Sequence, residues 1–92
     1  MHYVYILCCS DGTFYVGSTR NLEDRIIAHN DGRGASYTFK RRPVRLVYSE
    51  VFLAESEAIR REHQLKRWSA AKKESLITGN IQKLKRLSKP RS

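Results

Sequence analysis

The chain has no long apolar run and few residues that could cross-link it. No stretch approaches the roughly eighteen apolar residues that span a bilayer, and the N-terminus lacks the basic region, apolar run and cleavage site of a secretory signal. The two cysteines, Cys8 and Cys9, are neighbours whose side chains point to opposite faces of a strand, so neither a disulfide nor a zinc site is expected. We therefore expect an intracellular, cytoplasmic protein in which both cysteines are small apolar residues in a reducing compartment.

Acidic residues are also scarce, with 9 Asp and Glu against 18 Lys and Arg, for a formal charge of +9 over 92 residues. This excess favours a polyanionic partner, either nucleic acid or an anionic membrane surface, and charge alone does not choose between them. A chain of this length forms one domain with little room for more than one site. We assign residues 1–78 to that domain and residues 79–92 to a basic C-terminal tail that is expected to be mobile.

Two segments rich in aromatic and branched side chains, residues 2–9 and 13–17, predict a β-hairpin. Ser10, Asp11 and Gly12 lie between them. A three-residue loop fits best, with a type I turn followed by Gly12 in the left-handed region.

The loop length decides which side chains share a face of the hairpin. A three-residue loop pairs Cys9 with Thr13 and Leu7 with Tyr15, which puts Tyr5 and Tyr15 on one face. A two-residue loop would put the two tyrosines on opposite faces. An active site that uses both phenols requires the first register.

A helix is predicted to begin after Asn21, which can cap it, and to end after His29, where two glycines follow. Arg25 and His29 lie four residues apart on the face that carries the apolar anchors Leu22 and Ile26. A basic loop over residues 30–43, a third strand over 44–52, a second helix over 54–68 and a third helix from a Ser69 cap to Thr78 complete the expected domain.

Glu62 falls within the apolar stripe of the second predicted helix, which Ala58, Ile59, Leu65 and Trp68 outline. A carboxylate at such a position must be paired, protonated or bound to a cation, because a bare buried charge is unfavourable by several kcal/mol. The structural alternative to a metal ligand is an ion pair with Arg25 or with a nearby lysine.

Arg25, His29 and the tyrosines each have an ordinary explanation as well as a catalytic one. Arginine and histidine on a short helix can be a solvated pair that covers a sheet, and tyrosines pack well in strands. Together, an arginine can grip a phosphate through two hydrogen bonds, a histidine can move a proton, and phenols near a cation can act on a water nucleophile.

The remaining carboxylates show no spacing for a second metal, so one hard cation held by Glu62 and waters is the expected metal site. Basic side chains are predicted to track a phosphate backbone without reading sequence. The candidates are Lys40, Arg41, Arg42, Arg45, Arg61 and Lys66.

In these residues the chain resembles the GIY-YIG nuclease superfamily, above all its small stand-alone bacterial members, from Tyr3 to about Leu76. The first motif is Tyr3-Val4-Tyr5 and the second Tyr15-Val16-Gly17, in which Gly17 is the structural glycine. The arginine, histidine and glutamate of the family match Arg25, His29 and Glu62. Tyr3 replaces the glycine of the first motif, and an asparagine that some relatives carry has no evident match.

The resemblance implies an α+β fold, a three-stranded antiparallel sheet flanked by about three helices. It further implies hydrolysis of DNA phosphodiester bonds with Mg²⁺ or Mn²⁺ at a single site. Tyr5 or Tyr15 would be the general base, with Tyr5 favoured, Arg25 the phosphate clamp, Glu62 the metal ligand and His29 an aid to proton transfer or phosphate binding.

The expected partner is nucleic acid, DNA rather than RNA, with no membrane and with a protein partner that directs the domain to branched substrates in repair or recombination. The rival hypothesis is a nucleic-acid-binding module that keeps the scaffold without turnover, and a third is an interaction protein that docks on an acidic partner.

Overall fold

The hairpin forms as the turn residues predict. In the structure, a computed structural model that describes residues 1–88, strand β1 (His2–Cys8) pairs antiparallel with β2 (Phe14–Thr19), with Leu7 opposite Tyr15. The N–H of Cys9 donates to the carbonyl of Thr13 at 2.8 Å, and Gly12 has φ +84°. The three-residue loop with a left-handed glycine is confirmed.

The sheet has three strands in the order β2-β1-β3, all antiparallel. Strand β3 (Arg45–Phe52) begins one residue later than predicted and lies on the other side of β1. Helix α1 (Leu22–Asn30) begins after Asn21, whose side chain accepts a hydrogen bond from the N–H of Asp24 at 3.1 Å, as predicted. Helix α4 (Ala70–Thr78) begins after the Ser69 cap and ends at Gly79, which has φ +73°.

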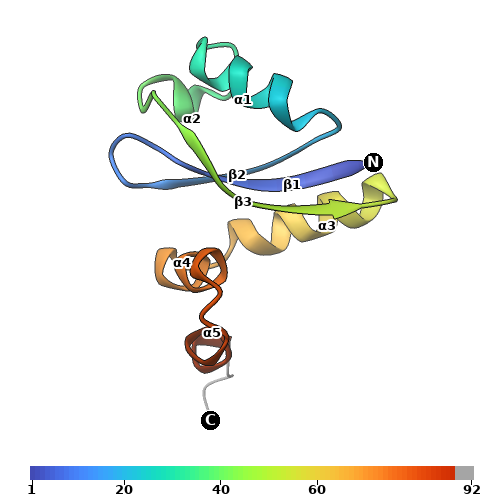
Figure 1. Ribbon diagram of the computed structural model, residues 1–92, viewed down its shortest axis with the longest axis vertical. Helices are drawn as coiled ribbons and strands as arrows, with labels where there is room; N and C mark the ends of the chain where they lie inside the picture. The colour runs from blue at the N-terminus through green and yellow to red at the C-terminus, as the bar shows by residue number, and fades with distance from the viewer. Residues whose placement is uncertain (89–92) are drawn as a thin grey trace.

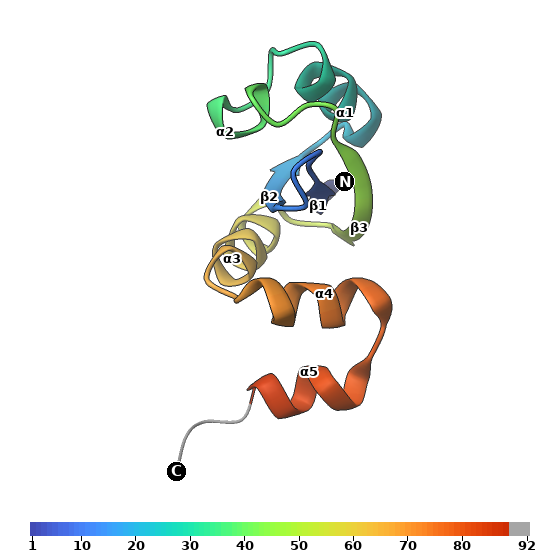
Figure 2. The same ribbon diagram turned by 90° about the vertical axis from the view of Figure 1, so that its left-hand side faces the viewer.

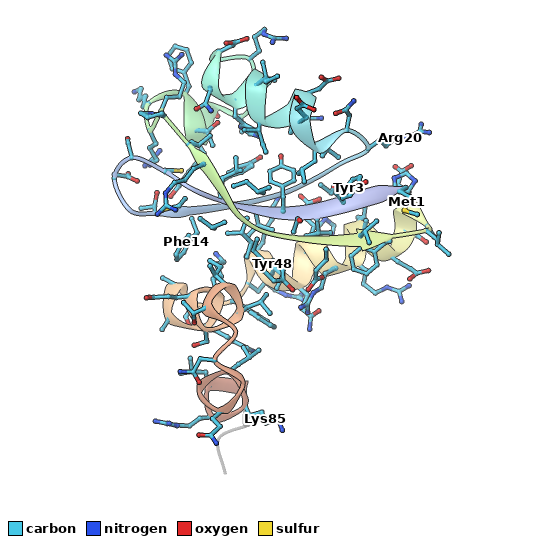
Figure 3. The ribbon with its side chains drawn as sticks, in the orientation of Figure 1. Met1, Tyr3, Phe14, Arg20, Tyr48 and Lys85 are labelled. Atoms are coloured by element: carbon cyan, nitrogen blue, oxygen red, sulfur yellow. The ribbon has the colours of Figure 1, made fainter. Side chains whose placement is uncertain are left out.

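Alternate residues of β1 point to opposite faces of the sheet, and they are buried on both because helices cover both faces. Figure 1 shows α1 on one face and α3 (Glu55–Lys66) on the other. Val4, Ile6 and Val16 pack towards α3, together with its residues Ala58 and Leu65. Figure 3 shows Phe14 and Tyr48 on this same side of the sheet, above α4.

The opposite face carries a second, smaller core. It contains Tyr5, Leu7 and Cys9, and Leu22 and Ile26 of α1 pack against it. Cys8 and Cys9 are both free thiols, as expected from their neighbouring positions. The catalytic candidates of the hairpin therefore face α1 and the loop that follows it.

Two helices lie where the sequence predicts none. Helix α2 (Ser36–Phe39) interrupts the basic loop over residues 30–43, and α5 (Ile81–Ser88) occupies most of the predicted tail. Figure 2 shows α5 beyond α4 on the side away from the sheet. The last residues of the predicted tail, 89–92, lie outside the described residues.

The α+β class and the three-stranded antiparallel sheet are confirmed, with five helices in the described chain in place of about three. Ile59 was predicted on the buried stripe of α3 but is 38% exposed, because it lies at the edge of the helix face that contacts the sheet.

Within residues 1–88, no helix combines the length and apolar character that crossing a membrane requires.

Candidate active site

The two motif tyrosines share the face of the hairpin that α1 covers. Their ring centroids lie 6.5 Å apart, so the register that brings both phenols together is confirmed. Tyr5 is 2% exposed, whereas Tyr15 is half-buried. Gly17 lies opposite Tyr5 on β2, and a Cβ at this position would overlap the Tyr5 hydroxyl. The second motif needs glycine because the phenol occupies the space of its side chain.

His29 links Tyr5 to the loop after α1. Its Nε2 lies 3.0 Å from the Tyr5 hydroxyl and its Nδ1 lies 2.8 Å from the hydroxyl of Thr38 on α2. The imidazole is 1% exposed. Its ring and that of Tyr15 pack edge to face, with 5.1 Å between their centroids. Burial, and then the nearby charge of Arg25, lower the pKa of His29 below its usual value. His29 is therefore a neutral, buried partner of Tyr5.

Thr38 and Gly34 belong to this arrangement, although sequence reasoning did not select them. A Cβ on Gly34 would overlap the His29 ring, so this glycine provides space as Gly17 does. Thr38 lies in the single-turn helix α2 and is fully buried. No motif or periodicity marks a threonine in a basic loop, so only its contact with His29 identifies it.

The pKa of Tyr5 moves upward, against the sequence expectation for a phenol near a cation. Burial raises it most, the phenol of Tyr15 raises it further, Arg25 lowers it and Glu62 raises it. Arg25 thus acts in the expected direction, but desolvation outweighs it. Four candidate groups act on this one hydroxyl, either by contact or through their charge.

Arg25 lies exposed on α1 beside a surface hollow of about 380 Å³. Ser18 of β2 and Ala58 of α3 also line this hollow. Among residues 1–88, no carboxylate pairs with the Arg25 guanidinium and no hydrogen bond from it is found. The guanidinium is thus available to an anion from outside the chain.

Glu62 is nearly buried, with 15% of its side chain exposed, and both carboxylate oxygens have partners. Oε1 accepts from the hydroxyl of Ser18, and Oε2 lies 2.7 Å from the ammonium of Lys66. Burial would raise the pKa of Glu62, but hydrogen bonds from Lys66 and Ser18 outweigh it and hold the pKa below its usual range. The ion pair with a nearby lysine, weighed above as the structural alternative, is present, and the pair with Arg25 is not.

The Glu62 carboxylate fits a hard divalent cation in charge and in ligand type, since it is ionised and Mg²⁺ is often held by one carboxylate and waters. Within residues 1–88 no group of three or more His, Cys, Asp or Glu side chains is gathered, so the cation would depend on Glu62. The Lys66 ammonium stands beside Oε2, where a cation would bind, and would have to move away.

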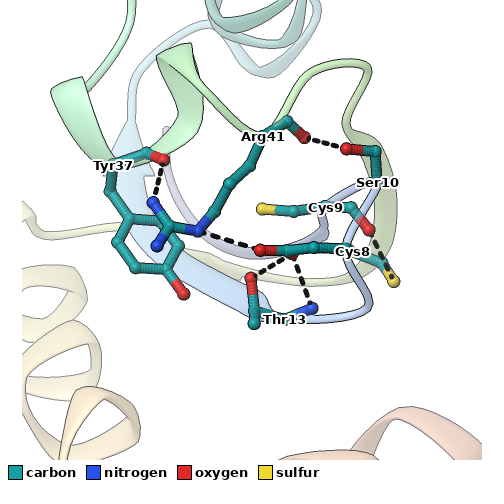
Figure 4. Close-up of polar contacts among 7 residues, drawn as sticks. Cys8, Cys9, Ser10, Thr13, Tyr37 and Arg41 are labelled. Carbon is teal, nitrogen blue, oxygen red and sulfur yellow. Dashed lines mark hydrogen bonds and ion pairs between the residues drawn. The ribbon is translucent and has the colours of Figure 1, made fainter.

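The predicted phosphate-binding residues differ in how far their side chains are engaged within the chain. Lys40, Arg42 and Arg45 are exposed, and Arg42 also donates to the carbonyls of Phe39 and Asn30. Arg41 pairs with Asp11 at 3.0 Å and donates to the carbonyl of Tyr37 (Figure 4).

Arg61 instead joins α3 to β3. It holds both oxygens of Glu50, at 2.9 and 3.0 Å. This half-buried pair competes with the predicted role of Arg61 in binding nucleic acid, and Lys66 is similarly engaged by Glu62.

Another hollow, of about 320 Å³, is lined in part by Tyr15. Tyr37, Lys66 and Lys73 contribute to its walls. Lys73, on α4, is half-buried, and burial lowers its pKa. It has no acidic partner in the described part of the chain. Sequence reasoning did not select Lys73, because nothing separates it from its neighbour Lys72 until the fold turns them to different sides.

A family model described as the GIY-YIG catalytic domain matches residues 1–75. A UPF0213 protein of Staphylococcus saprophyticus is 52% identical over 77 residues, covering 84% of this chain and 94% of the relative. A UPF0213 protein of Natronomonas pharaonis is 51% identical over 76 residues, covering 83% of this chain and 89% of the relative.

Two solved structures are also similar, both determined by solution NMR. The UPF0213 protein BH0048 of Bacillus halodurans is 42% identical with a TM-score of 0.55, covering 97% of this chain and 98% of that one. The protein EF2693 of E. faecalis is 38% identical with a TM-score of 0.59, covering 99% of this chain and 92% of that one. None of these names states an activity.

Proposed function

The chain belongs to the GIY-YIG catalytic-domain family, and from this premise we propose that it is a divalent-metal-dependent endonuclease that hydrolyses phosphodiester bonds of DNA. One observation carries the proposal. The hydroxyl of Tyr5 is bound to His29 and lies within the electrostatic influence of Arg25, Tyr15 and Glu62. A basic group, a phosphate-binding guanidinium and a carboxylate near one hydroxyl are the components that phosphodiester hydrolysis needs.

In the proposed reaction a water molecule attacks phosphorus while its proton moves to the Tyr5 oxygen, and the phenol's own proton moves to Nε2 of His29. The tyrosine remains neutral throughout, so its raised pKa is no obstacle. The bond from phosphorus to the leaving sugar oxygen breaks, and that oxygen takes a proton from solvent. His29 later returns its proton to solvent, and the products are a phosphate monoester and a hydroxyl.

The other groups stabilise charge in this scheme. Arg25 binds the non-bridging phosphate oxygens through its free guanidinium. Glu62 would hold one Mg²⁺ or Mn²⁺ ion, which supplies Lewis-acid stabilisation of the leaving oxygen when bound. Half-buried Tyr15 is the alternative base, because solvent reaches it more easily than Tyr5.

The substrate we propose is DNA of branched or flapped structure, bound through its backbone. The exposed side chains of Lys40, Arg42 and Arg45 support backbone binding. We propose that they bind phosphates and do not read base edges, so targeting to a particular structure would come from the shape of the DNA or from a protein partner.

Cleavage of flapped, branched and linear DNA by the purified protein, with Mg²⁺ or with EDTA, tests the proposal. We expect cleavage with Mg²⁺ alone, and a loss of at least about 100-fold in rate for Glu62→Gln and Arg25→Gln, because each removes a charge that stabilises the transition state. Glu57→Gln and Arg60→Gln, at exposed positions of α3, are the matched controls and should keep the activity. Undiminished cleavage by the Glu62 and Arg25 variants would point to a contaminating nuclease.

The rival, a binding module without turnover, has one specific observation in its favour: Lys66 already neutralises Glu62. The same assays separate the two. Salt-dependent binding of DNA without any Mg²⁺-dependent cleavage would favour the module, and absence of binding would favour a protein-interaction role.

A further inference from the structure

We propose that Thr38 is a positioning residue, which holds His29 in the tautomer that carries its proton on Nδ1 and leaves Nε2 to accept from Tyr5. Thr38 touches no reacting atom, so it would act only through the imidazole. The catalytic consequence rests on the proposed nuclease function. The tautomer itself is a property of the folded chain and can be measured without a substrate.

The argument starts from the single proton of the Thr38 hydroxyl. Its oxygen lies 2.9 Å from the carbonyl oxygen of Ala35, which can only accept, and 2.8 Å from Nδ1 of His29. If the hydroxyl donates to Ala35, the hydroxyl oxygen must accept from Nδ1. A neutral imidazole carries one N–H, so Nε2 is then without a proton and accepts from the Tyr5 hydroxyl at 3.0 Å.

The reverse chain of donors leaves a buried hydroxyl unsatisfied. In it Thr38 donates to Nδ1, Nε2 donates to the Tyr5 oxygen, and the phenolic proton needs another acceptor. Among residues 1–88 the Tyr5 hydroxyl has no hydrogen-bond partner other than His29, and Tyr5 is 2% exposed. The first arrangement gives every proton an acceptor, so the geometry favours Nδ1–H.

In the resting protein, before any proton is transferred from Tyr5, protonation of both ring nitrogens is also disfavoured. His29 is almost fully buried, and the nearest charge that acts on it is the cation of Arg25. A second positive charge would be desolvated and repelled.

The surrounding chain holds Thr38 in place. Gly34 gives the imidazole room next to α2. Arg41 ties this helix to the hairpin, because it donates to the Tyr37 carbonyl, as Figure 4 shows, and pairs with Asp11. The one-turn helix is therefore a fixed support for a single hydroxyl, in a segment where the sequence predicted only a loop.

Nitrogen-15 NMR of the His29 ring in the full-length protein tests the tautomer, with Thr38→Ser as the conservative variant that keeps the hydroxyl. We expect the wild type and Thr38→Ser to carry the proton on Nδ1. In Thr38→Val the Nε2–H form should rise to a substantial share. A wild-type ring protonated mainly on Nε2 would overturn the inference, even if Thr38→Val did not fold.

The positioning role has its own readout. We expect Thr38→Val to lower kcat for DNA cleavage at least about tenfold with little change in KM, because a wrong tautomer stops proton transfer without affecting binding. Thr38→Ser should restore the rate. A folded Thr38→Val with changed tautomer and full kcat would refute this role, whereas an Nδ1–H wild type that cleaves nothing would refute the nuclease proposal alone.

Discussion

At the scale of single residues, two glycines define where the buried phenol and imidazole lie. Gly17 faces the Tyr5 hydroxyl, and Gly34 faces the His29 ring. Gly17 lies within β2 with ordinary strand backbone, so an alanine there has no conformational penalty and acts through the clash alone. This isolates the packing role of the motif glycine from any role in backbone freedom.

We therefore expect Gly17→Ala to lower the free energy of unfolding by about 1–3 kcal/mol, the usual range for overpacking a core. Urea denaturation measures this directly. The nearest atoms to the added methyl are the hydroxyl oxygen and the ring Cζ of Tyr5, so the same substitution should be less destabilising in a Tyr5→Leu background, which removes both. Equal losses in the two backgrounds would mean that the clash is with some other group.

Glu62 shows how far residue chemistry can be predicted from position. A carboxylate on an apolar stripe was predicted to be paired, protonated or bound to a cation, and it is paired with Lys66, one helical turn further on. Whether a metal ion displaces the Lys66 ammonium depends on the relative affinities of the two cations for the Glu62 carboxylate. No sequence pattern shows these affinities.

At the scale of elements, α4 presents its two neighbouring lysines to different surroundings. Lys72 lies over the ring of Trp68, 4.2 Å from its centroid, whereas Lys73 lines the hollow beside Tyr15. A half-buried ammonium without an acidic partner, next to a candidate catalytic phenol, is suited to a phosphate of the bound strand.

Lys73→Gln should therefore weaken binding of single-stranded DNA and lower the slope of log affinity against log salt by roughly 0.7, the effect of one phosphate contact. Lys72→Gln removes the same charge one residue away and should change the slope far less. Fluorescence anisotropy in EDTA measures both without cleavage. Equal changes in slope for the two variants would mean that Lys73 makes no particular phosphate contact and only adds to the overall positive charge of the surface.

The β3–α3 connection depends on an arginine that the sequence analysis assigned to nucleic acid. Arg61 holds both oxygens of Glu50, which also accepts from the hydroxyl of Tyr48. Burial, followed by the hydrogen bond to Glu50, raises the pKa of Tyr48 to about 12. This cluster fastens the helix that carries Glu62 to the sheet, so Arg61 serves the site at least through its support of α3.

At the scale of the whole molecule, the fold separates into a two-faced sheet and a helix beyond it. The family match ends at residue 75, and α5 follows α4 on the side away from the sheet (Figure 2). The boundary near residue 78 stays a prediction. The position of α5 means that it contributes little to the packing that positions Tyr5, His29 and Glu62.

A chain ending at Gly79 should consequently keep the free energy of unfolding and the Mg²⁺-dependent cleavage rate of the full protein. DNA binding should weaken, because α5 carries basic residues such as Lys85 and Arg86 that add to the positive field. Urea denaturation and cleavage assays of the two chains check this. Loss of folded structure on truncation would place α5 within the domain.

Much of this architecture follows from local rules. The turn glycine Gly12 set the hairpin register and so put Tyr5 and Tyr15 on one face, and the Asn21 and Ser69 caps set the starts of α1 and α4. Helical spacing brought His29 onto the face of α1 that packs on the sheet. These features depend on neighbours within a few residues, which the sequence shows directly.

The sequence by itself therefore determined the three strands, their pairing in the hairpin, the family and the set of candidate groups. Only the tertiary structure decided that Tyr5 and His29 are buried against each other, that Thr38 reaches the imidazole, and that Lys66 and Arg61 are engaged by carboxylates. The reason is physical: burial and hydrogen-bond partners depend on segments distant in the chain, and they shift the pKa values and determine the proton positions of a site in ways that residue type alone does not show.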